Sequence, residues 1–153
     1  MRKKIIVVAV MLVIVLCSCA KREPAKSPAS EELANKISEQ FKDLNINIEE
    51  KKAEELFDDK NNMDFSKIEN FAVRQSKHGE IGVFRLYTDV NADYIKEAAH
   101  KRILKLQAEA CGLENLNIAN NAEVRSYGNY VYYVSHNEKD KIFKIIEDEL
   151  KGV

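Results

Sequence analysis

Apolar residues repeat at helical spacing in the stretch that begins at Ser30. The stripe consists of Leu33, Ile37, Phe41 and Leu44. Positions three or four residues apart share one face of a helix. Ser30 is a residue type that caps helices, and Glu31 and Glu32 suit the positive end of the helix dipole. The pattern predicts an N-terminal helix with one face to bury, then a shorter helical stretch over 49–57 and a polar loop at 58–62.

Two similar halves follow this loop. In the first half, strand-like segments at 70–76 and 80–88 flank the turn 77–79. Bounded runs of β-branched and aromatic residues are typical of strands. A helix is predicted over 91–110, capped by its first residue and followed by Gly112, a residue type that often ends helices.

The second half repeats this order. Strands at 122–127 and 130–136 enclose Gly128-Asn129, a dipeptide suited to a two-residue hairpin turn, and a helix is predicted over 137–151. The chain is therefore predicted to be an α+β protein. Its N-terminal helix is followed by two strand-strand-helix units (ββα-ββα) that form an antiparallel sheet with helices mainly on one face.

The two-residue turn fixes the register of the second hairpin. It places Tyr127 opposite Tyr130 and Arg125 opposite Tyr132, and alternation puts these four side chains on one face. The other face carries Val124, Val131 and Tyr133. Tyrosine and arginine are enriched at recognition hot spots, so this tyrosine ladder (Arg125, Tyr127, Tyr130, Tyr132) is a candidate interaction surface. Its alternative role is cross-strand stabilisation beneath the N-terminal helix.

The chain begins with a basic and then an apolar segment. Residues 2–4 are basic, and the thirteen residues 5–17 are apolar without a break. As a helix they would span about 20 Å at roughly 1.5 Å per residue, which is less than the ~30 Å hydrocarbon core of a bilayer. A secretory leader is therefore expected, not a membrane-spanning anchor.

The end of the leader resembles a lipidation signal. Leu16-Cys17-Ser18-Cys19 is similar to the bacterial lipobox, in which an aliphatic residue and then small residues precede the cysteine that is lipidated. The resemblance implies removal of residues 1–18 as a lipoprotein signal peptide and a diacylglyceryl group on Cys19. Two acyl chains hold a protein on a bilayer much more firmly than one. We therefore expect a lipid anchor to the cell membrane on its extracytoplasmic side, and no cofactor besides this covalent lipid.

Behind the anchor, the composition changes twice. Residues 19–29 hold both prolines of the chain, Pro24 and Pro28, and show no apolar period, so a lipidated N-terminus and flexible tether are expected there. Residues 30–153 are expected to form a single domain. The chain is 45% hydrophobic and 32% charged, which is the composition of a globular protein.

The charge balance speaks against one class of partner. The whole chain has a formal net charge of −1, and removal of Arg2, Lys3 and Lys4 with the leader lowers it to −4. Proteins that bind nucleic acid need a basic surface to neutralise phosphates. We therefore expect no nucleic-acid partner.

Cys111 is the cysteine that keeps a free thiol once Cys17 is discarded and Cys19 is acylated. The nearest histidine in the sequence, His100, lies eleven residues earlier on the same predicted helix, about 16 Å away along its axis. Direct activation of the thiol by His100 is therefore excluded. Cys111 is expected to fill the core or a helix end, unless the fold brings in another histidine and makes it the nucleophile of an enzyme.

Metal binding is not expected. Four residues have the spacing of a calcium loop: Asp58, Asn62, Asp64 and Glu69. However, Lys60 stands at a ligand position and Met63 replaces the turn glycine. The three histidines lack paired ligand spacing, and the chain contains no phosphate-binding glycine loop or common hydrolase motif.

Three stretches of the chain resemble a known family. They are Glu80-Ile81-Gly82-Val83-Phe84, Lys101-Arg102-Ile103 and Gly128-Asn129-Tyr130-Val131. Over roughly residues 31–150 they are similar to the bacterial lipoprotein family catalogued as domain of unknown function 4358. The resemblance implies a lipoprotein domain and no catalytic residues. We therefore expect a non-enzymatic binding or interaction module of the cell envelope, with an unknown envelope protein or ligand as partner. The alternative is an envelope enzyme with Cys111 as nucleophile.

Overall fold

The computed structural model describes residues 24–57 and 63–153. The expected signal peptide, Cys19 and the polar run 58–62 lie outside these residues. The helices are α2 (Ser30–Gln40), α3 (Glu50–Phe57), α4 (Ala92–Glu109), α5 (Leu113–Asn120) and α6 (Lys139–Lys151). The strands are β1 (Ile46–Asn47), β2 (Ile68–Gln75), β3 (Glu80–Leu86), β4 (Glu123–Tyr127) and β5 (Tyr130–Ser135).

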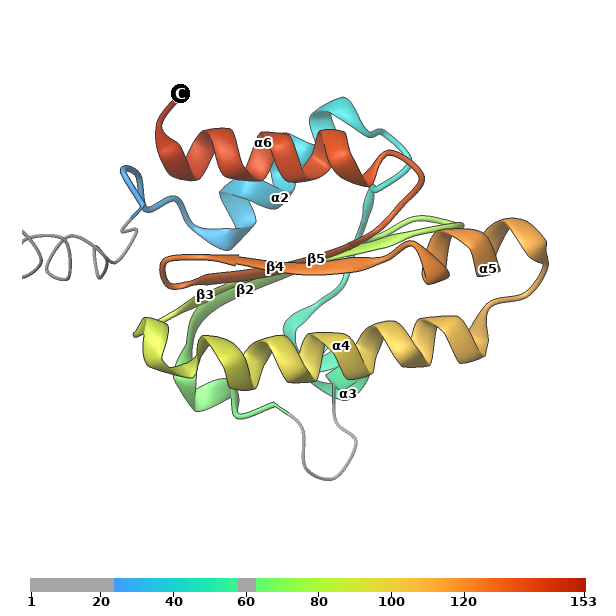
Figure 1. Cartoon of the computed structure of the whole chain (residues 1–153), viewed down its shortest axis with the longest axis horizontal. Helices are drawn as coiled ribbons and strands as arrows, with labels where there is room; N and C mark the ends of the chain where they lie inside the picture. Colours follow the sequence, from blue (N-terminus) through green and yellow to red (C-terminus); the bar gives the residue numbers. More distant parts are fainter. Residues whose placement is uncertain (1–23, 58–62) are drawn as a thin grey trace, which may run out of the picture.

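The strands form one antiparallel sheet in the order β1-β2-β3-β5-β4 (Figure 1). The prediction of an α+β protein with an antiparallel sheet is therefore confirmed. Along the chain, α4 follows the β2–β3 hairpin and α6 follows the β4–β5 hairpin, with the additional helix α5 between α4 and β4.

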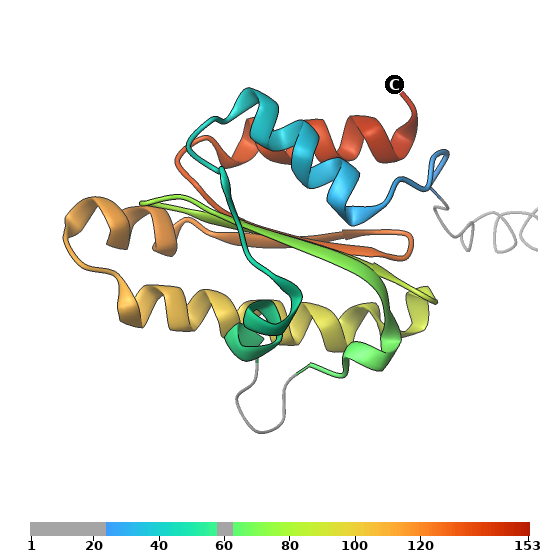
Figure 2. The ribbon, with the colours of Figure 1, turned by 180° about the vertical axis from the view of Figure 1, so that it is seen from behind.

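The prediction that the helices lie mainly on one face is wrong. Helices α2 and α6 cover one face of the sheet, and α3 and α4 cover the other, as Figures 1 and 2 both show. The reason lies in the interior strand β5, which lies between β3 and β4 and in which each residue from Tyr130 to Ser135 is buried. A strand that is apolar on both faces needs a helical layer on each side.

Two separate cores result. In the first, Leu33 and Ile37 of α2 meet Ile142 and Ile146 of α6 over one face of β3 and β5. In the second, residues of α3 and α4 such as Phe57 and Ile95 pack against Phe84, Val131 and Tyr133. Burying one such side chain contributes roughly 1.5–3 kcal/mol, so each helix layer is held mainly by its apolar contacts with the sheet.

Helix α2 begins and ends differently from the prediction. Ser30 does not act as the N-cap, which is Ala29, because the Ser30 hydroxyl donates to the Asn70 carbonyl oxygen (3.1 Å) and the Ser30 N–H to Asn70 Oδ1 (2.7 Å). The helix ends at Gln40, yet Phe41 and Leu44 beyond it are still buried in the α2–α6 core. The apolar stripe therefore predicted correctly that these residues are buried, but it predicted a longer helix than the one observed.

Helix α5 was not expected. The segment 113–120 contains asparagines at 115, 117 and 120, a residue type with low helix propensity. Gly112, which was expected to end the preceding helix, instead precedes α5 with a φ of 86°. This left-handed conformation is one that glycine adopts without strain, and it redirects the chain after α4.

The second hairpin has the predicted register. Tyr127 pairs with Tyr130 and Arg125 with Tyr132 across a turn in which Gly128 has a φ of 57°. Tyr130 and Tyr132 belong to the α2–α6 core and Val131 to the opposite one, so the two predicted faces are also confirmed.

The N-terminal segment (residues 24–29) is docked against one end of the sheet. Hydrogen bonds hold it there, from Ala25 N to Leu150 O (2.9 Å), from Arg85 Nη1 to Ser27 O (2.9 Å) and from the Tyr130 hydroxyl to Pro28 O (2.7 Å). Residues 25–28 are thus part of the folded unit, contrary to the expected free tether up to residue 29. We call this end of the sheet the proximal end. The distal end is the opposite one, where β3 begins and β5 ends (Figure 1).

Candidate functional site

The tyrosine ladder is not an open surface. Tyr130 and Tyr132 have 0% and 1% of their surface exposed, and Tyr127 and Arg125 are half-buried. The prediction of an interaction surface at these four residues is therefore wrong. The physical reason is that α2 and α6 need an apolar face to pack on, and this face of β5 supplies it.

Each ladder side chain has a structural partner. The ring of Tyr132 lies 5.9 Å from that of Phe143 in α6, and the Arg125 guanidinium lies 3.9 Å from the centre of the same Phe143 ring. Arg125 also pairs with Glu123 (2.8 Å) and Glu147 (3.0 Å). Cation–π and cross-strand contacts of this kind stabilise a sheet. The ladder therefore attaches α6 to the sheet.

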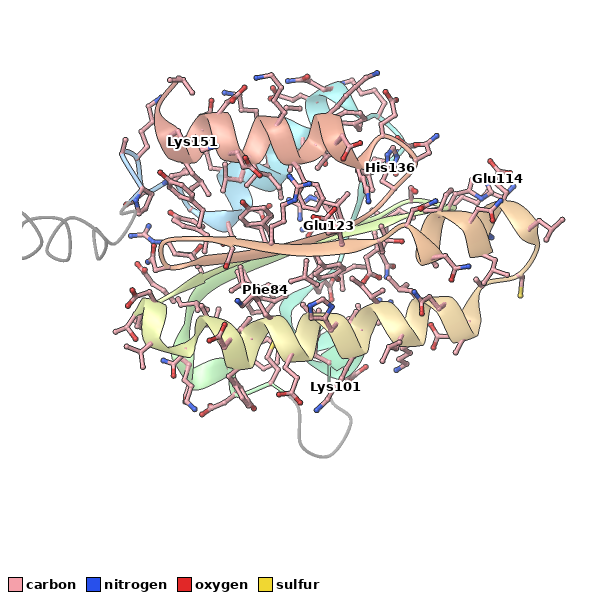
Figure 3. All side chains as sticks on the ribbon, viewed as in Figure 1. Phe84, Lys101, Glu114, Glu123, His136 and Lys151 are labelled. Atoms are coloured by element: carbon pink, nitrogen blue, oxygen red, sulfur yellow. The ribbon has the colours of Figure 1, made fainter. Side chains whose placement is uncertain are left out.

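A polar cleft of about 300 Å³ lies at the distal end. Residues 75–80, which include the β2–β3 turn, form one side of this distal cleft, and the end of α4 with the start of α5 forms the other. Figure 3 places Glu114 of α5 at this end of the molecule and Lys151 of α6 at the proximal end. The distal cleft is thus separated from the N-terminal segment by the length of β3 and β5.

A buried ion pair forms the floor of the distal cleft. The Arg102 guanidinium donates to both oxygens of Glu80, from Nε at 2.8 Å and from Nη2 at 2.6 Å, and the two side chains are 3% and 2% exposed. The Tyr133 hydroxyl donates to Glu80 Oε1, and Gln75 Nε2 donates to Oε2. The Glu80 carboxylate therefore accepts hydrogen bonds on both oxygens, which a charge taken out of water requires.

This pairing sets the charge states at the floor. Burial by itself would lower the pKa of Arg102, but hydrogen bonding to the carboxylate of Glu80 outweighs it and raises that pKa. Burial, together with the nearby negative charge of Glu80, raises the pKa of Tyr133 well above its usual value. The raised pKa values keep Arg102 charged and Tyr133 protonated at neutral pH, so the floor is an ion pair that accepts a hydrogen bond from a neutral phenol.

One nitrogen of the Arg102 guanidinium does not donate to Glu80. Arg102 Nη1 is buried and has no hydrogen-bond partner within the described part of the chain, and Glu109 Oε2 lies 3.7 Å away. Glu109 is about half exposed. Lys77 and His78 on the turn side add further polar groups to the walls. The distal cleft is therefore rich in hydrogen-bond donors and has balanced charge at its base.

Cys111 and His78 both line the distal cleft, but they do not form a catalytic pair. The His78 Nδ1 atom is hydrogen-bonded to Asn115 Oδ1 (2.6 Å), and the Cys111 thiol lies 3.7 Å from the Glu109 carbonyl oxygen. Within residues 24–57 and 63–153, no hydrogen bond joins this thiol to a histidine. Cys111 is exposed just beyond the end of α4, so of its two expected places, in the core or at a helix end, the core is wrong.

The other two histidines lie elsewhere. His100 is exposed on α4, whereas His136 is buried, with Nε2 3.0 Å from Asp43 Oδ2 and Nδ1 accepting from the Glu138 N–H. Among the residues that the structure describes, no group of three or more potential metal-binding side chains gathers at one place. In the same residues, no helix combines the length and apolar composition that crossing a bilayer demands.

Sequence reasoning missed Glu80 and Arg102. A signal was present, because Arg102 falls on the buried stripe of α4 that contains Ile95, Ala99 and Ile103. A charged residue on such a stripe is almost never buried without a partner. The sequence did not identify that partner, because Glu80 lies 22 residues earlier, at the start of a strand.

Comparison of the chain with protein-family models, with curated proteins and with solved structures finds no match. The case for a function therefore comes from the residues themselves.

We predict that Glu80→Gln strongly destabilises the protein, because it leaves the Arg102 charge buried without its counter-ion. Breaking a buried pair in this way costs about 3–5 kcal/mol. The measurement is the free energy of unfolding in urea. The matched control is Glu97→Gln, which removes the exposed partner of Lys101 and should cost less than about 1 kcal/mol. Equal losses for both variants would contradict a buried, structurally required pair.

We also predict that stability falls above about pH 10. Burial raises the pKa values of Tyr130, Tyr132 and Tyr133 above the ordinary value of 10.0. Above pH 10 the unfolded chain loses these protons while the folded protein keeps them, so the unfolded state gains by up to about 1.4 kcal/mol per pH unit for each tyrosine. Urea unfolding between pH 8 and 11 measures this slope. Tyr132→Phe should flatten it, and an unchanged slope would count against the assignment.

Proposed function

We propose that this chain is a bacterial lipoprotein of the cell envelope, anchored through diacylglycerol on Cys19. Its folded part is a non-enzymatic binding module with the ββα-ββα order, of the kind that the resemblance to the family of domain of unknown function 4358 implies. The observation that carries the proposal is the lipobox-like Leu16-Cys17-Ser18-Cys19 directly before a folded domain. The partner is an envelope protein or a polar ligand on the extracytoplasmic side.

The position of the N-terminal segment supports this anchoring. Residues 25–28 are hydrogen-bonded to the domain at the proximal end. Only six residue steps separate Cys19 from Ala25. An anchor on Cys19 would therefore hold the proximal end beside the bilayer, and no other part of the described fold has to rearrange for this.

The position of the distal cleft supports a binding role. Its floor residue Glu80 begins β3, and its neighbour Ser135 ends β5, whereas Arg85 and Tyr130 at the other ends of these strands hold the N-terminal segment. Five residue steps along a strand span roughly 17 Å. The distal cleft thus lies on the side of the domain away from the anchor, where an envelope partner has access.

The chemistry of the distal cleft favours binding over catalysis. A nucleophilic cysteine needs a base within hydrogen-bond reach, and in the described residues the Cys111 thiol has none. His78 is instead engaged by Asn115, which itself donates to the Cys111 carbonyl oxygen (3.0 Å). These contacts tie the β2–β3 turn to α5 and give the cleft a fixed, polar wall.

The anchor is tested by replacing its cysteine. We expect the natural protein to carry the mass of a diacylglycerol-modified Cys19 and to remain with the membrane fraction. Cys19→Ala should lack the acyl mass, because the thiol that accepts the lipid is gone. The variant should either keep its leader uncleaved or be absent from the acylated protein. Intact-protein mass spectrometry and membrane extraction provide the measurement. The control is Cys111→Ala, which should change neither result. An unmodified Cys19 in the natural protein would refute the anchor.

The binding role is tested at the distal cleft. A photo-crosslinking residue in place of the exposed Lys77, in the intact anchored protein, should yield adducts that the same residue at Lys144 does not yield. Lys77 lines the cleft, and Lys144 is an exposed residue of α6 on another part of the surface. Mass spectrometry of the adducts in native membranes is the measurement. Identical adducts at both positions, or none at either, would count against the cleft as the contact site.

A further inference from the structure

An exposed aromatic and apolar corner lies between β3 and α4. Tyr87 is 64% exposed and Val90 is 81% exposed, and Tyr94 at the start of α4 is also exposed. Lys67 joins them, because its carbonyl oxygen accepts from the Tyr87 N–H (3.2 Å) and its ammonium lies 4.9 Å from the centre of the Tyr94 ring. We call these four residues the Tyr87–Tyr94 corner.

This corner is at the proximal end. Leu86, which precedes it, exchanges two hydrogen bonds of 2.8 Å with Asn129 in the β4–β5 turn. Arg85, one residue earlier, donates to Ser27 of the N-terminal segment. Figures 1 and 2 show the start of α4, the β4–β5 turn and the N-terminal segment at the same end of the molecule.

The covalent chain limits how far this end can lie from the anchor. Six residue steps from Cys19 to Ala25 span at most about 22 Å, whatever their conformation. A compact domain of this size has a radius of gyration of about 14 Å, so its width exceeds that reach. The docking of residues 25–28 therefore keeps the proximal end near the bilayer at all times.

The side chains of the corner suit the interface of a bilayer. Tyrosine is enriched at the level of the lipid headgroups, where its ring is apolar and its hydroxyl is hydrated. Among the described residues, two lysines at the corner have acidic partners, Lys67 with Asp64 (3.4 Å) and Lys96 with Asp93 (2.6 Å). The attraction therefore comes from the rings and Val90, and it does not require anionic lipid.

We propose that the Tyr87–Tyr94 corner rests in the headgroup region of the membrane that holds the anchor, and so fixes the orientation of the domain. This inference rests on the lipid anchor of the proposed function. In this orientation the distal cleft points away from the bilayer. Exposed apolar residues also occur on α5, at Leu113 and Leu116, so it is the position beside the N-terminal segment that singles out the corner.

The test uses an introduced tryptophan, because the chain has none of its own. Val90→Trp places it in the corner, and Leu113→Trp places it on α5 at an almost equal native exposure of 80%. Tryptophan itself favours membrane interfaces, so Leu113→Trp is the matched control. Each full-length lipidated variant is reconstituted into phosphatidylcholine vesicles with or without bromine atoms on the acyl chains, and its fluorescence is recorded.

We expect V90W to emit at shorter wavelength than L113W and to lose emission in the brominated vesicles, while L113W emits equally in both kinds of vesicle. Unquenched emission from V90W, or equal quenching of both variants, would overturn the orientation while leaving the anchor intact. Vesicle flotation and intact mass check the anchor in the same samples. Protein that lacks the acyl mass and does not float with the vesicles would overturn the proposed function, and the corner contact with it.

Discussion

The burial of β5 on both of its faces is the constraint on which the rest of the structure depends. Tyr130 and Tyr132 are packed under α2 and α6, while Val131 and Tyr133 are packed against α4. A sheet with such an interior strand needs two helical layers, and neither broad face remains open to a partner. The proposed binding role therefore places recognition at the ends of the strands, where loops and helix termini carry the polar groups.

At the distal end, this arrangement places a buried ion pair beneath the α4 layer. Glu80 begins β3 just where the α4 layer would bury it, and Arg102 meets it from the buried stripe of α4. Well-packed apolar side chains at the same places would stabilise the fold equally well. The role of the Glu80–Arg102 pair is therefore to position α4. It holds the C-terminal half of this helix against the β2–β3 turn and so shapes the distal cleft.

How much the sequence predicted depends on whether the signal was local. The register of the second hairpin followed from the Gly128-Asn129 turn alone and is confirmed. Which faces of the sheet the helices cover is not set by a local sequence signal. The unbroken apolar run 130–134 nevertheless indicated that this strand is buried on both faces. The Ser30 hydroxyl, which was expected to cap the helix, donates instead to the carbonyl oxygen of Asn70, 40 residues away. The distal cleft is assembled from separate segments, and no spacing along the chain could reveal it.

A lipid anchor by itself confines a domain to a surface and leaves it free to rotate. A flexible link of ten residues would permit any face to meet the bilayer. Hydrogen bonds to residues 25–28 restrain the last part of such a link, because they hold these residues at one end of the sheet. The covalent reach then becomes shorter than the domain is wide. With the proposed anchor on Cys19, orientation at the membrane would therefore follow from how residues 25–28 pack, and it would position the distal cleft without a rigid stalk.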